Sequence, residues 1–472
     1  KFYGQPVFAV AAETVLQAKA AAKLGVIECN SEEPVLTIEQ ALEKNYLIST
    51  DHVMQRGDAE AGVKAAPNQI SGQMEIGGQD HFYLEGQVSM AVPQEDGDVV
   101  LHCSTQHPSE VQFNVAHVLD RPANAVTVEV RRMGGAFGGK ESQAAQWAAL
   151  AALVAVKTGR AAKCRLDRDD DMILTGKRHE LAGKWSVGFD DEGRIQAADV
   201  EMATRCGCSK DLSDAISDRA MFHLDNSYYL DQVRILCKRM RTDTVSNTAF
   251  RGFGGPQGMM IGERMIEDVA RFVGKDTLDV RKANFYGGAG RDTTPYYMQV
   301  EDFVLPEMIE ELEVSSDYRK RREAITEFNK TSQIIKRGLA LTPVKFGISF
   351  TTTFLNQAGA LIHIYKDGSI LLNHGGTEMG QGLFLKVAQI VAEEFQCDVD
   401  RIKITATNTA KVPNTSATAA SSGTDMNGMA AMIAARTIKR RLIAFACNQY
   451  KVKEADVEFT RNQVRIGNQV VS

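Results

Sequence analysis

Three glycine-rich turns carry the residues of this sequence that could do chemistry. They lie at residues 133–141, 247–258 and 374–382, and each precedes a run with helical spacing. Backbone amides at the N-terminus of a helix favour an anion, because their N–H groups have no partner within the helix. A fourth segment, residues 415–425, is rich in small and hydroxyl-bearing side chains. Together the four segments predict a site for one large, polar, phosphate-bearing cofactor surrounded by helix N-termini.

The first turn, MGGAFGGKE at residues 133–141, is close to a nucleotide-binding loop. Gly134, Gly139 and Lys140 have P-loop spacing, but the next residue should be Ser or Thr and is Glu141. A carboxylate beside the phosphates would repel them. The sequence therefore disfavours a nucleoside triphosphate, and a tight strand-to-helix turn is the simpler alternative.

The second turn places an aromatic residue, Phe253, between two glycines. Glycine neighbours allow the backbone to approach a ligand closely, and an aromatic ring there can cover a flat one. A buried turn aromatic is the alternative. The glycines of this turn do not have the dinucleotide-binding spacing.

Composition narrows the class of protein. The chain has 472 residues, enough for about three domains at roughly 150 residues each. Its 44% hydrophobic and 24% charged residues are ordinary for a soluble globular protein. A net charge of -6 without a long basic run argues against a nucleic-acid partner. The longest apolar run, residues 147–156, is shorter than the about 20 residues that a membrane span needs.

The cysteines and histidines do not predict a metal site made by the protein. The 8 cysteines are scattered and form no Cys-x-x-Cys motif, which argues against zinc ribbons and local iron–sulfur loops. The 9 histidines form no His-x-x-x-His pair. This cysteine usage is typical of reduced thiols, and we predict a cytoplasmic protein.

The elements that must position the turns follow from hydrophobic spacing and turn residues. Residues 1–55 predict a small α/β unit, and the polar run after it predicts a linker. In that unit we expect strands at 6–10 and 26–29 and helices at 13–24 and 37–44. Further strands are predicted at 99–104, 125–132, 162–166, 360–365, 369–373 and 402–405, with a hairpin at 184–203. Further helices are predicted at 142–157, 259–273, 383–395 and 429–446.

Both ends of the sequence predict a piece of a longer protein. A strand-like run begins at once, and residues 463–471 form an apparent hairpin in which the sequence stops. We therefore expect a fragment or a processed piece.

Taken together, the motifs resemble the xanthine dehydrogenase and aldehyde oxidase family, in its molybdenum-binding large subunit. The matching segments are residues 77–85, 133–141, 219–223, 249–258, 347–351, 375–382 and 418–425. The similarity covers essentially the whole chain. It implies an α+β fold with a partial α/β-hammerhead domain at 1–55 and a linker at 56–74. Two elongated mixed α/β molybdopterin-binding domains would follow at 75–330 and 331–472, the second truncated at its C-terminus.

The resemblance also implies the cofactor contacts. Molybdenum would be held by the dithiolene of a molybdopterin, with oxo, sulfido and hydroxo ligands and no direct protein ligand. Gln79, the amides around Phe137 and Arg251, and Ala420 would contact the oxygen ligands of the metal. The implied pterin contacts are Met379, Gly380, Gln381, Ala420, Ser421 and Thr424.

On the substrate side, Glu141 and Arg219 match the purine-specific pair of the xanthine branch, where they would act in catalysis and binding. A carboxyl group and a guanidinium can read a purine edge, and the guanidinium can stabilise negative charge on a carbonyl oxygen. Phe253 and Phe350 would sandwich the heterocycle, and Thr351 would contact it. Taken singly, Arg219 could be a surface helix charge and Glu141 a first-turn carboxylate.

The implied reaction oxidises hypoxanthine and xanthine to urate. The molybdenum hydroxide would attack the ring carbon while hydride moves to the molybdenum sulfido group. The general base of the family, a Glu in a Pro-Gly-x-Gly-Glu segment, does not occur in this sequence. We therefore expect this piece to be inactive alone.

The implied partners are a purine substrate and an iron–sulfur and FAD domain or subunit, within an oligomer. The 2Fe-2S clusters and FAD would lie on that partner. One alternative is a hydroxylase of another N-heterocycle or an aldehyde in the same family. A second is a cofactor-free scaffold piece, and a P-loop ATPase is a distant third.

Overall fold

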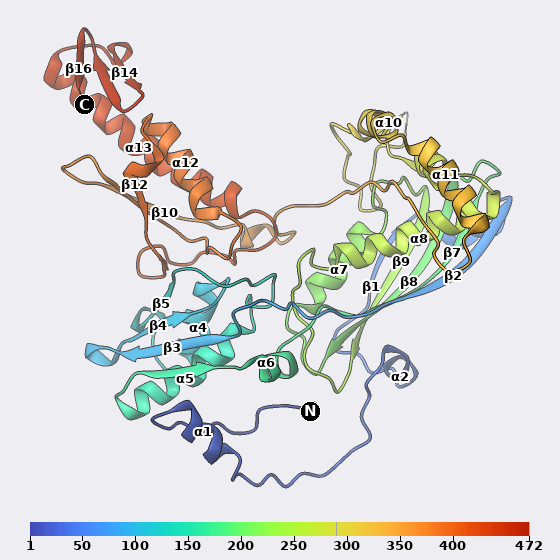
Figure 1. Cartoon of the computed structure of the whole chain (residues 1–472), viewed down its shortest axis with the longest axis horizontal. Coiled ribbons are helices and arrows are strands. Elements are labelled where there is room, and N and C mark those ends of the chain that lie inside the picture. Colours follow the sequence, from blue (N-terminus) through green and yellow to red (C-terminus); the bar gives the residue numbers. More distant parts are fainter. Residues whose placement is uncertain (289, 472) are drawn as a thin grey trace.

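The computed structural model describes residues 1–288 and 290–471, and it shows a mixed α/β chain with three main bodies. In Figure 1 the large sheet lies on the right, the sheet that holds β3, β4 and β5 lies at the lower left, and α12 and α13 lie above it. No helix in the described ranges has both the length and the apolar character that crossing a membrane requires. The predicted α+β fold class is confirmed.

The N-terminal segment contains two short helices and an extended chain. Helices α1 (Val15–Ala22) and α2 (Ile38–Glu43) lie inside the predicted ranges, and each starts with a Thr–Gln capping box. The strands predicted at 6–10 and 26–29 are wrong: in the described structure those residues have no strand partner. A hydrophobic run becomes a strand only where another strand satisfies its backbone.

The linker predicted at 56–74 is also wrong. These residues complete β1 (His52–Arg56) and form α3 (Ala59–Ala65) and most of β2 (Asn68–Ile76). Exposed and half-buried positions alternate along β2, so its polar residues occupy the exposed face of a strand. Because most residues of the segment are polar, its two-residue alternation was not recognised as a strand pattern in the sequence.

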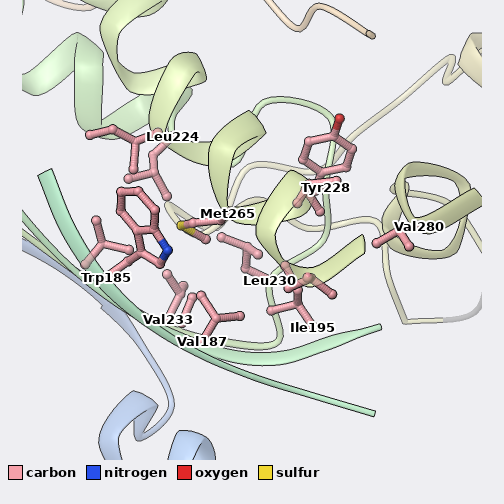
Figure 2. Packing of buried hydrophobic residues seen from close by; sticks show 14 of the residues in the cluster. Trp185, Val187, Ile195, Leu224, Tyr228, Leu230, Val233, Met265 and Val280 are labelled. Carbon is pink, nitrogen blue, oxygen red and sulfur yellow. The ribbon is translucent and has the colours of Figure 1, made fainter. Parts of the chain in front are cut away.

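The large sheet has the strand order β1-β9-β8-β7-β2. Strands β7 (Leu181–Phe189) and β8 (Ile195–Gly207) form the predicted hairpin, and β8 runs parallel to β9 (Gln232–Arg241). The crossover between the parallel strands contains α7 (Ser213–His223), and α8 (Gly255–Val273) follows β9. The core lies between the sheet and these helices, where Figure 2 shows Trp185 of β7 beside Leu224 and Met265.

Two glycines of α8 and the glycine directly before it allow α8 to touch α7 backbone to backbone. A Cβ atom placed on Gly254, Gly258 or Gly262 would lie 2.0, 2.0 or 2.1 Å from a carbonyl oxygen of α7 or of Leu224, which follows it. The spacing of four residues puts all three on one helix face. This close packing fixes the position of α7 and of the side chains on it.

The second sheet has the order β13-β5-β4-β3-β6 and joins the two halves of the chain. Its strands are β3 (Val88–Pro93), β4 (Val99–Cys103), β5 (Val126–Val130), β6 (Ala162–Arg165) and β13 (Thr407–Asn408). Helices α4 (Pro108–Val118) and α5 (Ala144–Thr158) pack on it. Because β13 pairs with β5, residues more than 270 positions apart share one sheet.

The C-terminal region packs α12 (Leu383–Phe395) and α13 (Gly423–Tyr450) on a three-stranded sheet. Its strands are β10 (Ala360–Ile364), β11 (Ile370–His374) and β12 (Ile402–Ile404). A small sheet of β14 (Val457–Thr460), β15 (Gln463–Ile466) and β16 (Gln469–Val471) follows, and β15 and β16 form the predicted hairpin. The remaining helices are α6 (Arg168–Leu174), α9 (Thr277–Asn284), α10 (Leu305–Ser315) and α11 (Tyr318–Thr331).

The contact between α7 and α8 gives a test of the fold. Gly258→Ala should lower the free energy of unfolding by at least about 2 kcal/mol, because the new methyl group meets the Ala220 carbonyl oxygen and two backbones must separate. Helix propensity alone predicts the opposite, a gain of up to about 1 kcal/mol. Urea unfolding measures the change, and Met260→Ala, at an exposed position of α8, is the control. A stabilised Gly258→Ala protein would show that the helices are not in backbone contact.

Candidate active site

The three glycine-rich turns and the hydroxyl-rich segment meet around one cavity of about 1310 Å³. Every predicted site residue except Gln79 lines it. The predicted residues on its wall are Phe137, Glu141, Arg219, Arg251, Phe253, Phe350, Thr351, Met379, Gly380, Gln381, Ala420, Ser421 and Thr424. The cavity therefore combines segments from both halves of the chain.

The first turn is folded so that it packs against the second. Gly138 has φ +100°, and a Cβ atom there would lie 2.7 Å from the carbonyl oxygen of Ala249. Arg251 N–H donates to the Phe137 carbonyl at 2.8 Å. Phe137 itself has φ +55°, and the residue stays 42% exposed at the cavity wall. The glycines thus serve a close approach of two backbones beside the site.

Lys140 of the P-loop-like sequence is used inside the protein. Its side chain is fully buried, and its ammonium group donates to Ser104 Oγ at 2.9 Å and to Glu85 Oε2 at 3.2 Å. The Gly134 amide donates to the same Glu85 oxygen at 2.9 Å. This ion pair supports the turn from behind, and it leaves Lys140 with a carboxylate partner instead of a phosphate.

Gln106, which sequence reasoning missed, connects the first turn to the hydroxyl-rich segment. Its Oε1 accepts from Gly138 N–H at 2.9 Å, and its Nε2 donates to the Thr418 carbonyl at 3.0 Å. The backbone N–H of Gln106 donates to the Lys140 carbonyl, and the Gln106 carbonyl accepts from Thr418 N–H, both at 2.9 Å. Only 3% of Gln106 is exposed. Gln106 lies just before α4, which begins with Pro108. A buried side-chain amide at this position matches no recognisable sequence motif.

Glu378 organises the third turn and was also missed. Its carboxylate accepts from the amides of Gly380 at 2.9 Å and of Gly382 and Phe384 at 3.0 Å. Burial raises the pKa of this carboxyl group, but these backbone hydrogen bonds outweigh burial and hold it below the usual value. The Glu378 carboxylate therefore binds backbone amides at the N-terminus of α12. From the sequence, these amides were expected to bind an anionic group of the cofactor.

The fourth segment enters α13 with a strained backbone. Ala420 and Ser421 have φ +54° and +57°, a left-handed conformation that non-glycine residues adopt at a cost of about 1 kcal/mol or more each. The Ala420 carbonyl accepts from Ser349 N–H at 2.8 Å. No side chain caps the N-terminus of α13 in the described structure, and Gly423 and Thr424 line the cavity. Its first-turn amides are available to a ligand.

Glu141 is a buried carboxyl group on the cavity wall. Only 5% of the residue is exposed, and its Oε2 has no hydrogen-bond partner in the described structure. Burial, together with the nearby carboxylates of Asp211 and Glu110, raises the pKa of Glu141 to about 8. The side chain is therefore mostly a neutral acid at pH 7, and its O–H can donate to a ligand. The first-turn carboxylate interpretation is wrong, because α5 begins at Ala144 and Glu141 lies before its first turn.

Arg219 extends from α7, and the interpretation of it as a surface helix charge is wrong, since it is only 6% exposed. Its guanidinium donates to the Gly347 and Ser349 carbonyls, the second at 2.8 Å. These bonds hold the segment that carries Phe350, whose backbone exchanges hydrogen bonds with the Asn356 side chain. Burial lowers the pKa of Arg219, but a guanidinium stays charged at pH 7.

Gln79 is the predicted site residue that does not line the cavity. Its Oε1 accepts from Arg178 Nε at 2.6 Å, and Arg178 Nη2 donates to the Arg251 carbonyl at 2.9 Å. Gln79 is thus one side chain removed from the wall, which Arg251 lines.

The cavity fits a large, polar, anionic group. It presents the uncapped amides of α13 and the open backbone of Gly380, where an added Cβ atom would meet no atom within 4 Å. Backbone can therefore approach a ligand closely at the third turn. Among residues 1–288 and 290–471, no group of three or more His, Cys, Asp or Glu side chains is arranged to hold a metal ion.

Comparison with known proteins gives the family. Residues 39–285 and 311–472 each match a molybdopterin cofactor-binding domain. The chain belongs to this family of molybdopterin-binding domains, as found in the xanthine dehydrogenases and aldehyde oxidases.

The chain is similar to long enzymes over about a third of their length. It is 46% identical over 442 residues to a xanthine dehydrogenase of Drosophila pseudoobscura pseudoobscura. The aligned region covers 93% of this chain and 33% of that protein. It is 45% identical over 440 residues to a xanthine dehydrogenase/oxidase of Gallus gallus, with 93% and 32% covered.

Two solved structures share the fold. Quinoline 2-oxidoreductase from Pseudomonas putida 86 has a TM-score of 0.81 at 19% identity, covering 97% of this chain and 60% of that one. An aldehyde oxidoreductase from Desulfovibrio gigas has a TM-score of 0.75 at 22% identity, covering 89% and 47%. At these identities the likeness supports the fold.

The buried acid Glu141 predicts an inverted pH dependence of stability. Between the usual carboxyl pKa of 4.5 and its pKa of about 8, the folded chain holds a proton that the unfolded chain has lost. The contribution of Glu141 to the free energy of unfolding is therefore full below pH 4.5. It falls by up to about 1.4 kcal/mol per pH unit towards pH 8. Glu141→Gln removes this titration.

Urea unfolding of wild type and Glu141→Gln from pH 4.5 to 8.5 checks this prediction. The variant should gain stability relative to wild type as the pH rises. Glu28→Gln, at an exposed position, is the control and should follow wild type within about 0.5 kcal/mol. Parallel curves for Glu141→Gln and wild type would show that this carboxyl group titrates normally.

Proposed function

We propose that the protein is the molybdenum-binding part of an enzyme that oxidises purines, converting hypoxanthine and xanthine to urate. The observation that carries this proposal is the placement of Glu141 and Arg219 on the wall of one cavity. Both are buried, and both line the cavity in which the cofactor segments meet. The similarity to xanthine dehydrogenases supports the same substrate class.

In this proposal molybdopterin lies against the third and fourth segments. Met379, Gly380 and Gln381 would contact it on one side, and the first turn of α13, with Ala420, Ser421 and Thr424, on the other. The amides near Phe137 and Arg251 would face the oxygen ligands of the metal. When bound, the cofactor supplies the metal centre that transfers oxygen to the substrate and accepts its electrons.

The chain's own residues would read the purine and stabilise charge on it. As a neutral acid, Glu141 can donate its proton in a hydrogen bond to a ring nitrogen. Arg219 can stabilise negative charge that develops on a carbonyl oxygen, because a guanidinium in a desolvated wall acts strongly on nearby charge. Its bonds to Gly347 and Ser349 fix its plane before a substrate arrives.

Phe253, Phe350 and Thr351 would hold the flat ring. All three line the cavity, and the phenylalanines are only partly buried. Phe253 has φ +51° between two glycines that also have positive φ, so the backbone is bent to present this ring. An aromatic ring held in this way fits a planar heterocycle better than an aliphatic substrate.

Electrons taken from a purine must leave the site through another redox centre. We propose that 2Fe-2S clusters and FAD on a partner domain or subunit take them, in an oligomeric cytoplasmic enzyme of purine catabolism. The chain spans about a third of the length of the relatives it matches, and the proposed redox centres would lie in regions that the chain does not cover.

Turnover of the full-length protein, purified from cells that make the cofactor, tests the substrate. Arg219→Met should lower kcat/KM for xanthine by roughly 10²–10³, the effect of losing one oxyanion donor. Glu141→Gln should lower it less, because the amide keeps an N–H donor. Rates are divided by molybdenum content, so that a loss of cofactor is not counted as a loss of chemistry.

An aromatic aldehyde is the control substrate, because it offers no second carbonyl oxygen to Arg219, and its turnover should change little. If the wild-type protein holds molybdenum but oxidises only aldehydes or other N-heterocycles, the purine proposal is wrong. If it holds no molybdenum, a scaffold role replaces the enzyme.

A further inference from the structure

His223 is a buried histidine one helical turn after Arg219 on α7, and only 4% of the residue is exposed. Its Nδ1 bonds to the Arg219 carbonyl at 2.8 Å, and its Nε2 bonds to Gly347 N–H at 3.1 Å. A carbonyl can only accept and a backbone N–H can only donate, so the proton of the neutral ring lies on Nδ1. Burial lowers the pKa of His223 to about 4, and Nε2 therefore remains an acceptor at pH 7.

Gly347 belongs to an irregular segment, residues 343–350, which we call the strap. Side chains of α7 and of the turn after it hold the strap in place. The Asn226 side chain accepts from Lys345 N–H at 2.8 Å, and the Lys345 ammonium group pairs with the buried carboxylate of Asp225. Since the strap has no helix or strand bonds of its own, its position depends on these contacts.

Phe346 of the strap lines the cavity and packs on two side chains of α7. Its ring centroid lies 5.3 Å from that of His223 and 5.6 Å from Cζ of Arg219. A Cβ atom on Gly255, the first residue of α8, would lie 3.2 Å from the Phe346 ring and 3.5 Å from the His223 ring. The imidazole is thus packed between α8 and an aromatic ring of the cavity wall.

Both polar backbone groups of Gly347 are held by α7. His223 accepts from its N–H, and Arg219 donates to its carbonyl. A Cβ atom on Gly347 would lie 3.9 Å from atoms of both side chains, so the backbone of Gly347 runs directly beside them. A guanidinium has more N–H donors than the two that Arg219 gives to the strap, and the others remain for a ligand. The place of the strap therefore determines where those donors point.

We propose that His223 is a positioning residue for the substrate side of the cavity, which holds Gly347 and Phe346 so that Arg219 keeps one orientation toward a bound substrate. This role rests on the proposed function and extends it to a side chain behind the cavity wall. His223 acts through the strap and through Arg219, which lines the cavity, and it needs no contact with substrate.

Substitutions in the full-length enzyme separate the hydrogen bonds of His223 from its bulk. His223→Phe keeps a ring and removes both bonds. His223→Asn keeps a donor for the carbonyl of its own helix but is too short to reach Gly347. His223→Gln is the conservative variant, because its side-chain oxygen can accept from Gly347 N–H. The matched control is His117→Phe, since His117 is an exposed histidine that also lies in the last turn of a helix, α4.

Hydrogen–deuterium exchange, followed by mass spectrometry, reports on the strap without cofactor or substrate. The amides of Lys345, Gly347 and Ser349 each have an acceptor in the folded protein. Exchange in peptides that contain Gly347 should become roughly tenfold faster or more in His223→Phe and His223→Asn, because the strap opens more easily. His223→Gln should stay near wild type, and His117→Phe should match it. Unchanged exchange in both His223→Phe and His223→Asn would overturn the proposal.

Turnover of xanthine per molybdenum tests whether the strap acts through Arg219. His223→Phe and His223→Asn should lower kcat by roughly 10–100-fold with KM within about threefold, as the loss of a supporting partner does. Turnover of an aromatic aldehyde should change little, and His223→Gln should recover most of the xanthine activity. Combined with Arg219→Met, each should lose no more than Arg219→Met alone, because the two residues act as one unit.

Losses that multiply in the double variants, or an equal loss on the aldehyde, would show a general structural role and overturn the proposal. If the wild-type enzyme holds molybdenum and does not oxidise xanthine, the purine proposal fails. The exchange measurement, which needs no substrate, still decides whether His223 holds the strap.

Discussion

Gln106 makes the connection on which the cavity depends. Four hydrogen bonds, two from its side chain and two from its backbone, join the first glycine-rich turn to the segment before α13. The residues it joins are about 280 positions apart in sequence, so no local preference could hold them together. A buried amide without its partners would cost about 1–3 kcal/mol, which makes the connection specific. The strand pair β5–β13 strengthens it nearby.

Near this connection two carboxyl groups, Glu378 and Glu141, have opposite protonation states because their surroundings differ. Glu378 meets three amide donors, which favour its ionised form, while Glu141 meets apolar walls and two other carboxylates, which disfavour it. Lys140 has a carboxylate partner, and Arg219 and Arg178 donate to carbonyl oxygens. Of these groups, Glu141 and Arg219 line the cavity, so the wall presents one neutral and one cationic donor to a ligand. This suits a substrate that gains negative charge.

Residue patterns predicted most of the cavity wall and less of what supports it. The glycine-rich turns, α5, α8, α12 and the hairpin of β7 and β8 were recognisable because hydrophobic spacing and turn residues act locally. Residues 56–74, which include α3 and most of β2, were predicted as a linker because the exposed face of β2 is polar. Gln106, Arg178 and Glu378 were missed because their hydrogen-bond partners lie in distant or irregular segments, which leave no spacing signal. Arg219 and Glu141 were selected by resemblance, and each had a simpler alternative when considered alone.

The central claim is that both halves of the chain form one molybdopterin site. Molybdenum and pterin content, measured in the full-length wild-type protein and in Gln106→Leu from cells that make the cofactor, tests it most directly. We predict about one molybdenum and one pterin per wild-type chain. Gln106→Leu should lose roughly tenfold or more of both, as changes to supporting partners of a metal site do, while keeping cooperative unfolding. Full cofactor content in Gln106→Leu, or none in wild type, would contradict the account.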